Sequence, residues 1–129
     1  MSESASIGPL INNIMEFLAA LGDLRRATAK AESLKTSDGQ THRVEAVFED
    51  GIGRKAGLQK TEKGYRVVAD CHGLSAEQVK KQSESIQAVV QRYSYRKVVK
   101  QLQAEGYAVA EEQKQADGSI RLVARKWVS

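Results

Sequence analysis

Hydrophobic residues recur at helical spacing in two long stretches of this chain. Between Leu10 and Leu21, apolar residues return every three or four positions, which is typical of an amphipathic helix. Pro9 suits the first position of such a helix, and Gly22 suits the position just after its last turn. The pattern therefore predicts a first helix between Pro9 and Gly22, preceded by a short strand at Ser4 to Gly8.

The second helical pattern extends from Ser75 to Glu105 and contains two apolar stripes. Ser75 suits the N-cap, because its hydroxyl can accept a hydrogen bond from a first-turn amide. One stripe is formed by Val79, Ile86, Val89, Val90 and Tyr93, and the other by Tyr95, Val98, Val99 and Leu102. Because the two stripes lie on opposite sides, the helix either bends or breaks near Ser94, or its second half has another packing partner. That partner would be the first helix or another chain.

Elsewhere, apolar residues alternate with polar ones, which indicates strands. The predicted strands are 25–34, 42–48, 54–60 and 65–71, and a final hairpin pairs 107–113 with 120–127. In the predicted strand 42–48, a period of two puts four residues on one face: His42, Val44, Ala46 and Phe48. The connections are too short for parallel crossovers, so we expect the strands to be antiparallel.

These elements predict one α+β domain over residues 1–129. It contains an antiparallel sheet of about five to six strands packed by two helices, in the order β-α-β-β-β-β-α-β-β. The length of 129 residues suits a single domain. No stretch approaches the roughly 18 consecutive apolar residues of a membrane helix. The polar first residues are unlike a secretory signal, and Cys71 is the only cysteine, so we expect a cytoplasmic protein.

Charge is distributed unevenly along the chain, whose formal net charge is +4. Residues 1–50 contain five basic and eight acidic side chains, whereas residues 51–100 contain eleven basic and four acidic ones. A basic segment of this kind favours an acidic partner, which could be RNA or DNA, an acidic protein or an anionic ligand. The alternative is a solvated basic face with no partner.

A carboxylate, a thiol and an imidazole stand together at Asp70, Cys71 and His72. Such groups can form a nucleophilic site, but adjacent residues of a strand point to opposite faces. Cys71 is also in phase with the apolar residues before it, so we interpret it as a core residue. A small enzyme using these three residues is therefore the least favoured alternative. His42 and His72 are the only histidines, and their spacing predicts no metal site. We predict no catalytic residue and no cofactor.

Glycines are concentrated in the segment 51–57. This segment lacks the Gly-Lys-Ser/Thr ending and the following helix of a phosphate-binding loop. We therefore interpret it as a hairpin turn with a basic edge.

Two groups of residues are candidates for an interaction surface. Arg121, Arg125 and Trp127 share one face of the last predicted strand, and arginine and tryptophan are enriched in protein interfaces. The same row could stack bases and neutralise phosphates, or its arginines could simply be solvated. The second stripe of the long helix could face a partner as well. The candidate surface comprises Tyr95, Arg96, Val99, Leu102, Arg121, Arg125 and Trp127.

The C-terminal part of the chain contains a recurring family pattern. Its parts are Gln91-Arg92-Tyr93 with Tyr95, Gln103-Ala104-Glu105-Gly106-Tyr107, and Asp117-Gly118-Ser119-Ile120-Arg121-Leu122-Val123 followed by Trp127. This pattern resembles the family of the chloroplast and cyanobacterial hypothetical open reading frame 35, also described as domain of unknown function number 1257. The chain departs from the family in its few aromatic residues and in Ala56-Gly57-Leu58, where a larger residue is expected. It therefore resembles a divergent, bacterial member.

The resemblance implies no known catalytic activity. Bacterial members tend to be encoded beside AAA+ ATPases, which implies a cofactor or adaptor role for such a machine. Our leading hypothesis is therefore a non-enzymatic protein-interaction or adaptor module. The alternative is an RNA- or DNA-binding module that uses the basic segment 51–100.

Overall fold

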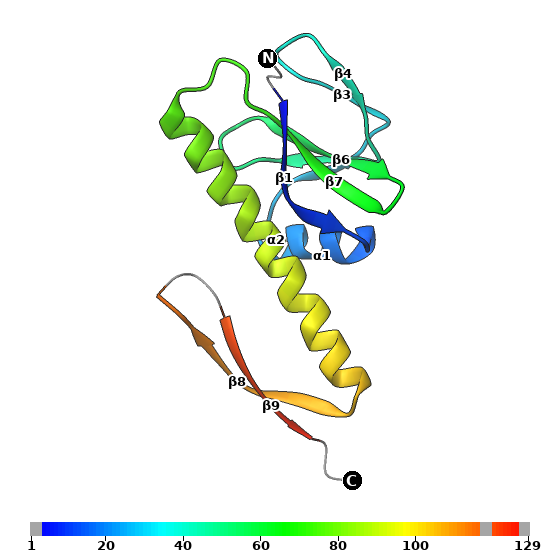
Figure 1. Cartoon of the computed structure of the whole chain (residues 1–129), viewed down its shortest axis with the longest axis vertical. Coiled ribbons are helices and arrows are strands. Elements are labelled where there is room, and N and C mark those ends of the chain that lie inside the picture. Colours follow the sequence, from blue (N-terminus) through cyan, green and yellow to red (C-terminus); the bar gives the residue numbers. More distant parts are fainter. Residues whose placement is uncertain (1–3, 117–119, 127–129) are drawn as a thin grey trace.

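Five antiparallel strands form the main sheet, in the order β1-β7-β6-β5-β2 (Figure 1). They are β1 (Ser4–Ile11), β2 (Thr28–Lys30), β5 (Ala46–Glu49), β6 (Lys55–Thr61) and β7 (Gly64–Asp70). The helices are α1 (Ile14–Asp23) and α2 (Ala76–Ala104). Two further hairpins pair β3 (Ser33–Lys35) with β4 (Thr41–Arg43), and β8 (Tyr107–Lys114) with β9 (Ile120–Lys126). The computed structural model describes residues 4–116 and 120–126.

The α+β class, the antiparallel pairing and the two packing helices are confirmed, but the predicted order of elements is wrong in its middle. The predicted strand 25–34 is the two strands β2 and β3, and the predicted strand 42–48 is β4 and β5. The final hairpin is confirmed, but β8 and β9 form a sheet of their own and do not join the main sheet.

Helix α1 begins later than the apolar pattern predicts. Asn13 is its N-cap, and the Asn13 side chain accepts a hydrogen bond of 3.1 Å from the backbone N–H of Glu16. The residues before it continue β1, which pairs with β7 as far as Ile11 opposite Tyr65. Pro9 falls where this pairing is irregular, between Ile7 and Ile11. A proline has no N–H to donate, so it is tolerated at such an irregularity.

The main core lies between the sheet and the two helices. Phe17 of α1 stands at its centre, with its ring centroid 5.6 Å from that of Phe48 and 5.9 Å from that of Tyr93. Tyr93 of α2 also fixes the start of α1, because its hydroxyl accepts hydrogen bonds from the backbone N–H groups of Asn12 and Asn13. The core thus joins β5, α1 and α2 through three aromatic rings.

The opposite face of the sheet is covered by the β3–β4 hairpin. Leu34, Val44 and Val47 form a small buried cluster there. A Cβ atom on Gly57 would lie only 2.7 Å from Val44 Cγ1, so glycine allows the hairpin to approach β6 this closely. The prediction that Val44 shares a face with Ala46 is wrong, because the chain leaves the ladder between β4 and β5 and the alternation restarts at Ala46.

Helix α2 is continuous from Ala76 to Ala104, so it does not break near Ser94, and the alternative of a second packing partner is confirmed. Its start at the Ser75 N-cap is confirmed by a complete capping box with Gln78. The first half of α2 packs on the main sheet. Beyond that sheet, the second half lies beside α1 and carries the β8–β9 hairpin (Figure 1). The two apolar stripes of α2 therefore serve two different layers of the same chain.

Candidate interaction surface

The β5–β6 turn is attached to α2 by buried polar groups. Asp50 is fully buried, and its Oδ1 accepts hydrogen bonds of 2.9 Å from the backbone N–H groups of Ile52 and Arg54. Gln82 of α2 is 1% exposed, and its side-chain amide donates to Asp50 Oδ2 at 2.9 Å and to the Asp70 carbonyl at 2.8 Å. Both protons of the Gln82 amide thus have buried acceptors. Because each group is satisfied, this cluster holds the turn, β7 and α2 in register.

The glycines of this turn do not form an anion site. The backbone N–H groups of Gly51 and Gly53 donate to Glu49 Oε1 at 2.7 and 3.2 Å. Those of Ile52 and Arg54 donate to Asp50, so two carboxylates of the chain already occupy the four amides that a phosphate would need. The interpretation of this segment as a hairpin turn is confirmed.

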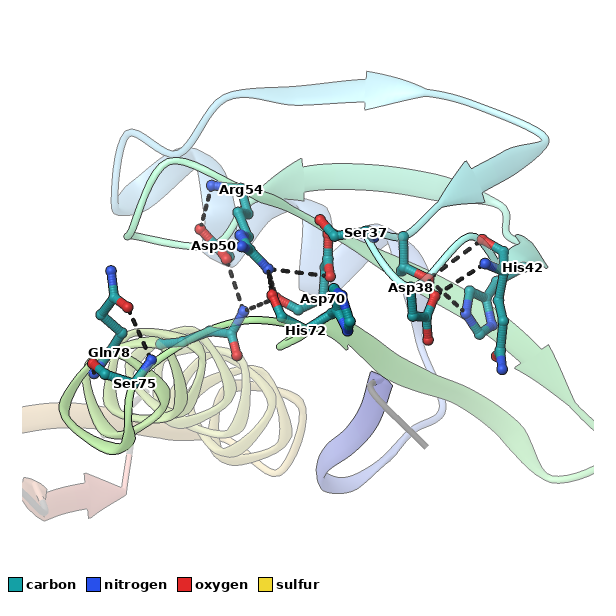
Figure 2. A network of polar contacts seen from close by, with 12 residues as sticks. Ser37, Asp38, His42, Asp50, Arg54, Asp70, His72, Ser75 and Gln78 are labelled. Atoms are coloured by element: carbon teal, nitrogen blue, oxygen red, sulfur yellow. Dashed lines mark hydrogen bonds and ion pairs between the residues drawn. The ribbon is translucent and has the colours of Figure 1, made fainter. Parts of the chain in front are cut away.

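Asp70 ties the end of β7 to the β3–β4 turn. Its Oδ2 accepts from the Ser37 backbone N–H at 3.0 Å and from the Ser37 hydroxyl at 2.6 Å. Figure 2 shows Arg54 reaching toward Asp70, and Arg54 Nη1 lies 3.3 Å from Asp70 Oδ1 and 2.7 Å from the His72 carbonyl. Three donors therefore hold the Asp70 carboxylate in a structural role. Cys71 lies beyond β7 and is half-buried rather than part of the core, so its interpretation as a core residue is wrong.

Both histidines of the chain lower the pKa of Asp38, which lies in the β3–β4 turn. The Thr36 hydroxyl donates to the Asp38 carboxylate and lies 3.3 Å from His42 Nε2. The Thr36 hydrogen bond, the Gln40 backbone N–H and then the charges of His42 and His72 hold the pKa of Asp38 below its usual value. Within 4–116 and 120–126, no three acidic, histidine or cysteine side chains are arranged to hold a metal ion. This cluster stabilises a turn.

Arg92, Arg96 and Lys100, in the second half of α2, pair with carboxylates of α1. Asp23 Oδ2 lies 2.8 Å from Arg92 Nε and 2.9 Å from Arg96 Nη1. Glu16, which is 5% exposed, accepts a hydrogen bond of 2.5 Å from Lys100 Nζ and one of 3.3 Å from Arg96 Nε. The Lys100 hydrogen bond holds the pKa of Glu16 below its usual value, and Arg92 and then Arg96 do the same for Asp23. Arg92, Arg96 and Lys100 of the basic segment thus pair with carboxylates of the acidic first part of the chain.

An apolar hollow runs between α2 and the edge of the β8–β9 hairpin. Its volume is about 400 Å³, and it is lined by Val90, Gln91, Ser94, Tyr95, Val98, Ile120 and Leu122. We call it the α2–β9 groove. Its rim is exposed, since Val98 is 45% and Ile120 is 40% accessible to solvent. The Tyr95 hydroxyl donates to the Glu112 carboxylate of β8, so the hairpin is anchored to α2 next to the groove.

The predicted interaction residues are only partly brought together. Tyr95 lines the groove, whereas Arg96 joins α2 to α1. Val99 and Leu102 are half-buried and do not line the groove. Arg121 and Arg125 are exposed on the strand face opposite to Ile120 and Leu122. Trp127 lies outside the described residues.

Sequence reasoning missed the groove itself. Its additional lining residues include Val98, Ile120 and Leu122. The signal was present in part, because Val98 belongs to the second stripe and Ile120 alternates in phase with Leu122. The sequence pattern does not show that the hairpin folds back onto α2, because this packing is not a local property of the chain.

Comparisons with known proteins give one match. A family model described as "Protein of unknown function (DUF1257)" matches residues 20–123, a range that includes all of α2 and β8. No curated protein and no solved structure matches the chain. In the described part of the chain, no helix has the length and apolar character needed to span a membrane.

Proposed function

The chain belongs to the family described as "Protein of unknown function (DUF1257)", and we propose from the geometry of the matched residues that it is a non-enzymatic protein-interaction module. The binding site we propose is the α2–β9 groove. Within this proposal, the expected partner is a subunit of a larger assembly, and an AAA+ ATPase is the first candidate.

The observation that carries the proposal is the exposed apolar lining of the groove. Val98 and Ile120 reach into solvent from two different elements, with Tyr95 and Leu122 beside them. Apolar side chains exposed together in a concave site are typical of surfaces that a partner covers. A volume of about 400 Å³ accommodates a few partner side chains.

The polar cluster around Asp50 and Asp70 supports a role without catalysis. The carboxylates of Asp50 and Asp70 and the amides of the glycine-rich turn all have partners within the chain. A catalytic group must be available to a substrate within hydrogen-bond reach. The polar cluster around Asp50 and Asp70 therefore stabilises the fold that presents the groove.

Site-specific photo-crosslinking in cells tests the proposal. We expect a photoreactive residue at Val98 to crosslink to one protein partner in high yield. The same residue at Lys63, which is exposed in the β6–β7 turn, is the matched control and should not crosslink to that partner. Leu122→Glu should abolish the crosslink at position 98 while the circular dichroism spectrum stays unchanged. A crosslink that forms equally from both positions, or that survives Leu122→Glu, would contradict the proposal. Mass spectrometry of the crosslinked partner decides whether it is an ATPase.

A further inference from the structure

We propose that the partner enters the α2–β9 groove as an extended segment with alternating apolar and acidic residues, which adds as a third strand to the free edge of β9. This inference rests on the proposed function above and specifies its partner. It combines three features of β9: an unpaired backbone edge, an apolar face and a basic face.

One backbone edge of β9 is unpaired in the part of the chain that the structure describes. In the described residues β9 pairs with β8 alone, so its other edge has no neighbouring strand. Every second residue of such an edge directs its N–H and C=O groups away from the existing partner, where a further strand can bind them. A hairpin of two strands is marginally stable by itself. A third strand would therefore stabilise the hairpin as well as bind it.

The position of the groove selects this edge. The groove is lined by Ile120 and Leu122 of β9 but by no residue of β8. A second hollow, on the other side of Ile120, is lined by Glu112 and Lys114 of β8. The α2–β9 groove thus runs along the outer edge of β9. A strand added there would direct every second side chain into the groove, toward Tyr95 and Val98.

The remaining side chains of the added strand would point the other way, beside the basic face of β9. Arg121 and Arg125 are exposed on that face, and β9 ends at Lys126 with no acidic residue among its seven. Basic residues at a sheet edge hinder unselective pairing. They also favour a partner whose outward side chains are acidic, because opposite charges on neighbouring strands attract and like charges repel.

A second copy of this chain fits the edge poorly. Symmetric antiparallel pairing of two β9 strands about Val123 would place Arg121 opposite Arg125 of the second copy, twice. Pairing of β9 with β8 of another copy is a head-to-tail contact, which builds a ring or an open filament rather than a closed pair. The charge pattern therefore counts against symmetric pairing of two β9 strands, and the occupant we propose is a different protein.

The test uses the full chain and a synthetic peptide of about eight residues, alternating valine and glutamate. We expect the peptide to bind and to slow hydrogen exchange of the 120–126 amides. A peptide of the same composition in scrambled order should bind at least about tenfold more weakly, since register and facing are lost. A peptide with proline at the valine positions should not bind, because it lacks the N–H groups that strand addition uses.

Charge reversal provides the matched variants. Arg121→Glu with Arg125→Glu should weaken binding of the glutamate peptide by about tenfold or more and create binding of the corresponding lysine peptide. Arg43→Glu with Lys60→Glu makes the same change of charge at exposed positions distant from β9, and it should leave both affinities unchanged.

The outcomes separate this inference from the proposed function. If the proline peptide binds as tightly as the valine peptide, strand addition is wrong. If no peptide binds but Val98 still crosslinks to a partner in cells, the partner chemistry is wrong and the interaction site stands. If the 120–126 amides are protected without peptide and sedimentation shows a dimer, the occupant is a second copy and the inference is overturned.

Discussion

The side-chain amide of Gln82 donates a 2.9 Å hydrogen bond to the carboxylate of Asp50, at a point where neither residue is measurably exposed to water. The same amide donates to the carbonyl of Asp70. One glutamine side chain thus donates hydrogen bonds to both a buried carboxylate and the last residue of a central strand. Two buried acceptors depend on it.

Gln82→Leu should lower the free energy of unfolding by about 2–3 kcal/mol. Leucine has about the same side-chain volume as glutamine, but it cannot donate a hydrogen bond. The Asp50 carboxylate and the Asp70 carbonyl each lose a donor in a buried site. Chemical denaturation measures the effect. Gln103→Leu, at an exposed position of the same helix, is the control and should change stability by less than about 0.5 kcal/mol. Equal stability of both variants would show that the buried amide contributes little.

Gly57→Ala should destabilise the protein by about 1–3 kcal/mol, because the new Cβ would meet Val44 Cγ1 at 2.7 Å. Val44→Ala in the same chain removes the obstructing methyl groups, so the double variant should lose less than the sum of the two single losses. Gly22→Ala is the control. It has open space around it in α1 and should leave stability unchanged or raise it by up to about 1 kcal/mol. Strict additivity would argue against the close approach of the β3–β4 hairpin.

The ion pairs of Glu16 predict a loss of stability in acid. Lys100 and Arg96 hold the pKa of Glu16 below its ordinary value of 4.5. A lowered pKa stabilises the folded state fully above that ordinary value, and the contribution disappears as the pH falls through the lower, folded value. Wild type should therefore exceed Glu16→Gln in stability near neutral pH, and the difference should shrink steadily below about pH 4. Glu84→Gln, at an exposed position of α2, should show little such dependence.

Tyr95→Phe should loosen the hairpin without affecting the main sheet. The Tyr95 hydroxyl donates to Glu112 and joins α2 to β8. Loss of one exposed hydrogen bond, worth about 1 kcal/mol, should raise hydrogen exchange of the 107–114 amides by about fivefold. Amides of β6 and β7 should exchange as before. Tyr65→Phe, in the main sheet, is the control and should leave the hairpin unchanged.

The nucleic-acid alternative makes a separate prediction. Arg92 and Arg96 are paired with Asp23, so we expect wild type to bind single-stranded RNA weakly and with a shallow dependence on salt. Asp23→Asn releases Arg92 and leaves Arg96 with Glu16 as its partner, so it should increase the affinity and steepen the slope. Tight binding by wild type with a steep negative slope would instead favour a nucleic-acid partner for the basic segment 51–100.

The fold class could be predicted from sequence, because alternation and helical spacing are local properties. The start of α1 could not. Leu10 and Ile11 fit a helical stripe as well as a strand, and the competition was decided by pairing with β7, more than fifty residues away in sequence. The break between β4 and β5 has the same origin, since Val44 turns toward Gly57 of a later strand.

The candidate site was predicted less well than the fold. The phase shift at Ser94 correctly indicates a second packing partner for α2, and Tyr95 begins the stripe that follows it. Arg96 was assigned to a free surface because a helix pattern shows which residues share a side but not what faces them. Its partners, Glu16 and Asp23, stand more than seventy residues earlier. A groove between a helix and a hairpin likewise exists only once both are placed.

The 29 residues of α2 give it a length of about 44 Å, which exceeds the roughly 27 Å of an eight-residue strand such as β1 or β8. We therefore expect two regions of local unfolding that share one helix: a strongly protected body, and a C-terminal region packed on the second half of α2. Occupation of the β9 edge should then slow the opening of the last turns of α2 and leave the Gln82 end unaffected. Binding at β9 would then increase the protection of the α2 amides most at the C-terminal end of the helix, and the increase would fall to zero near Ser94.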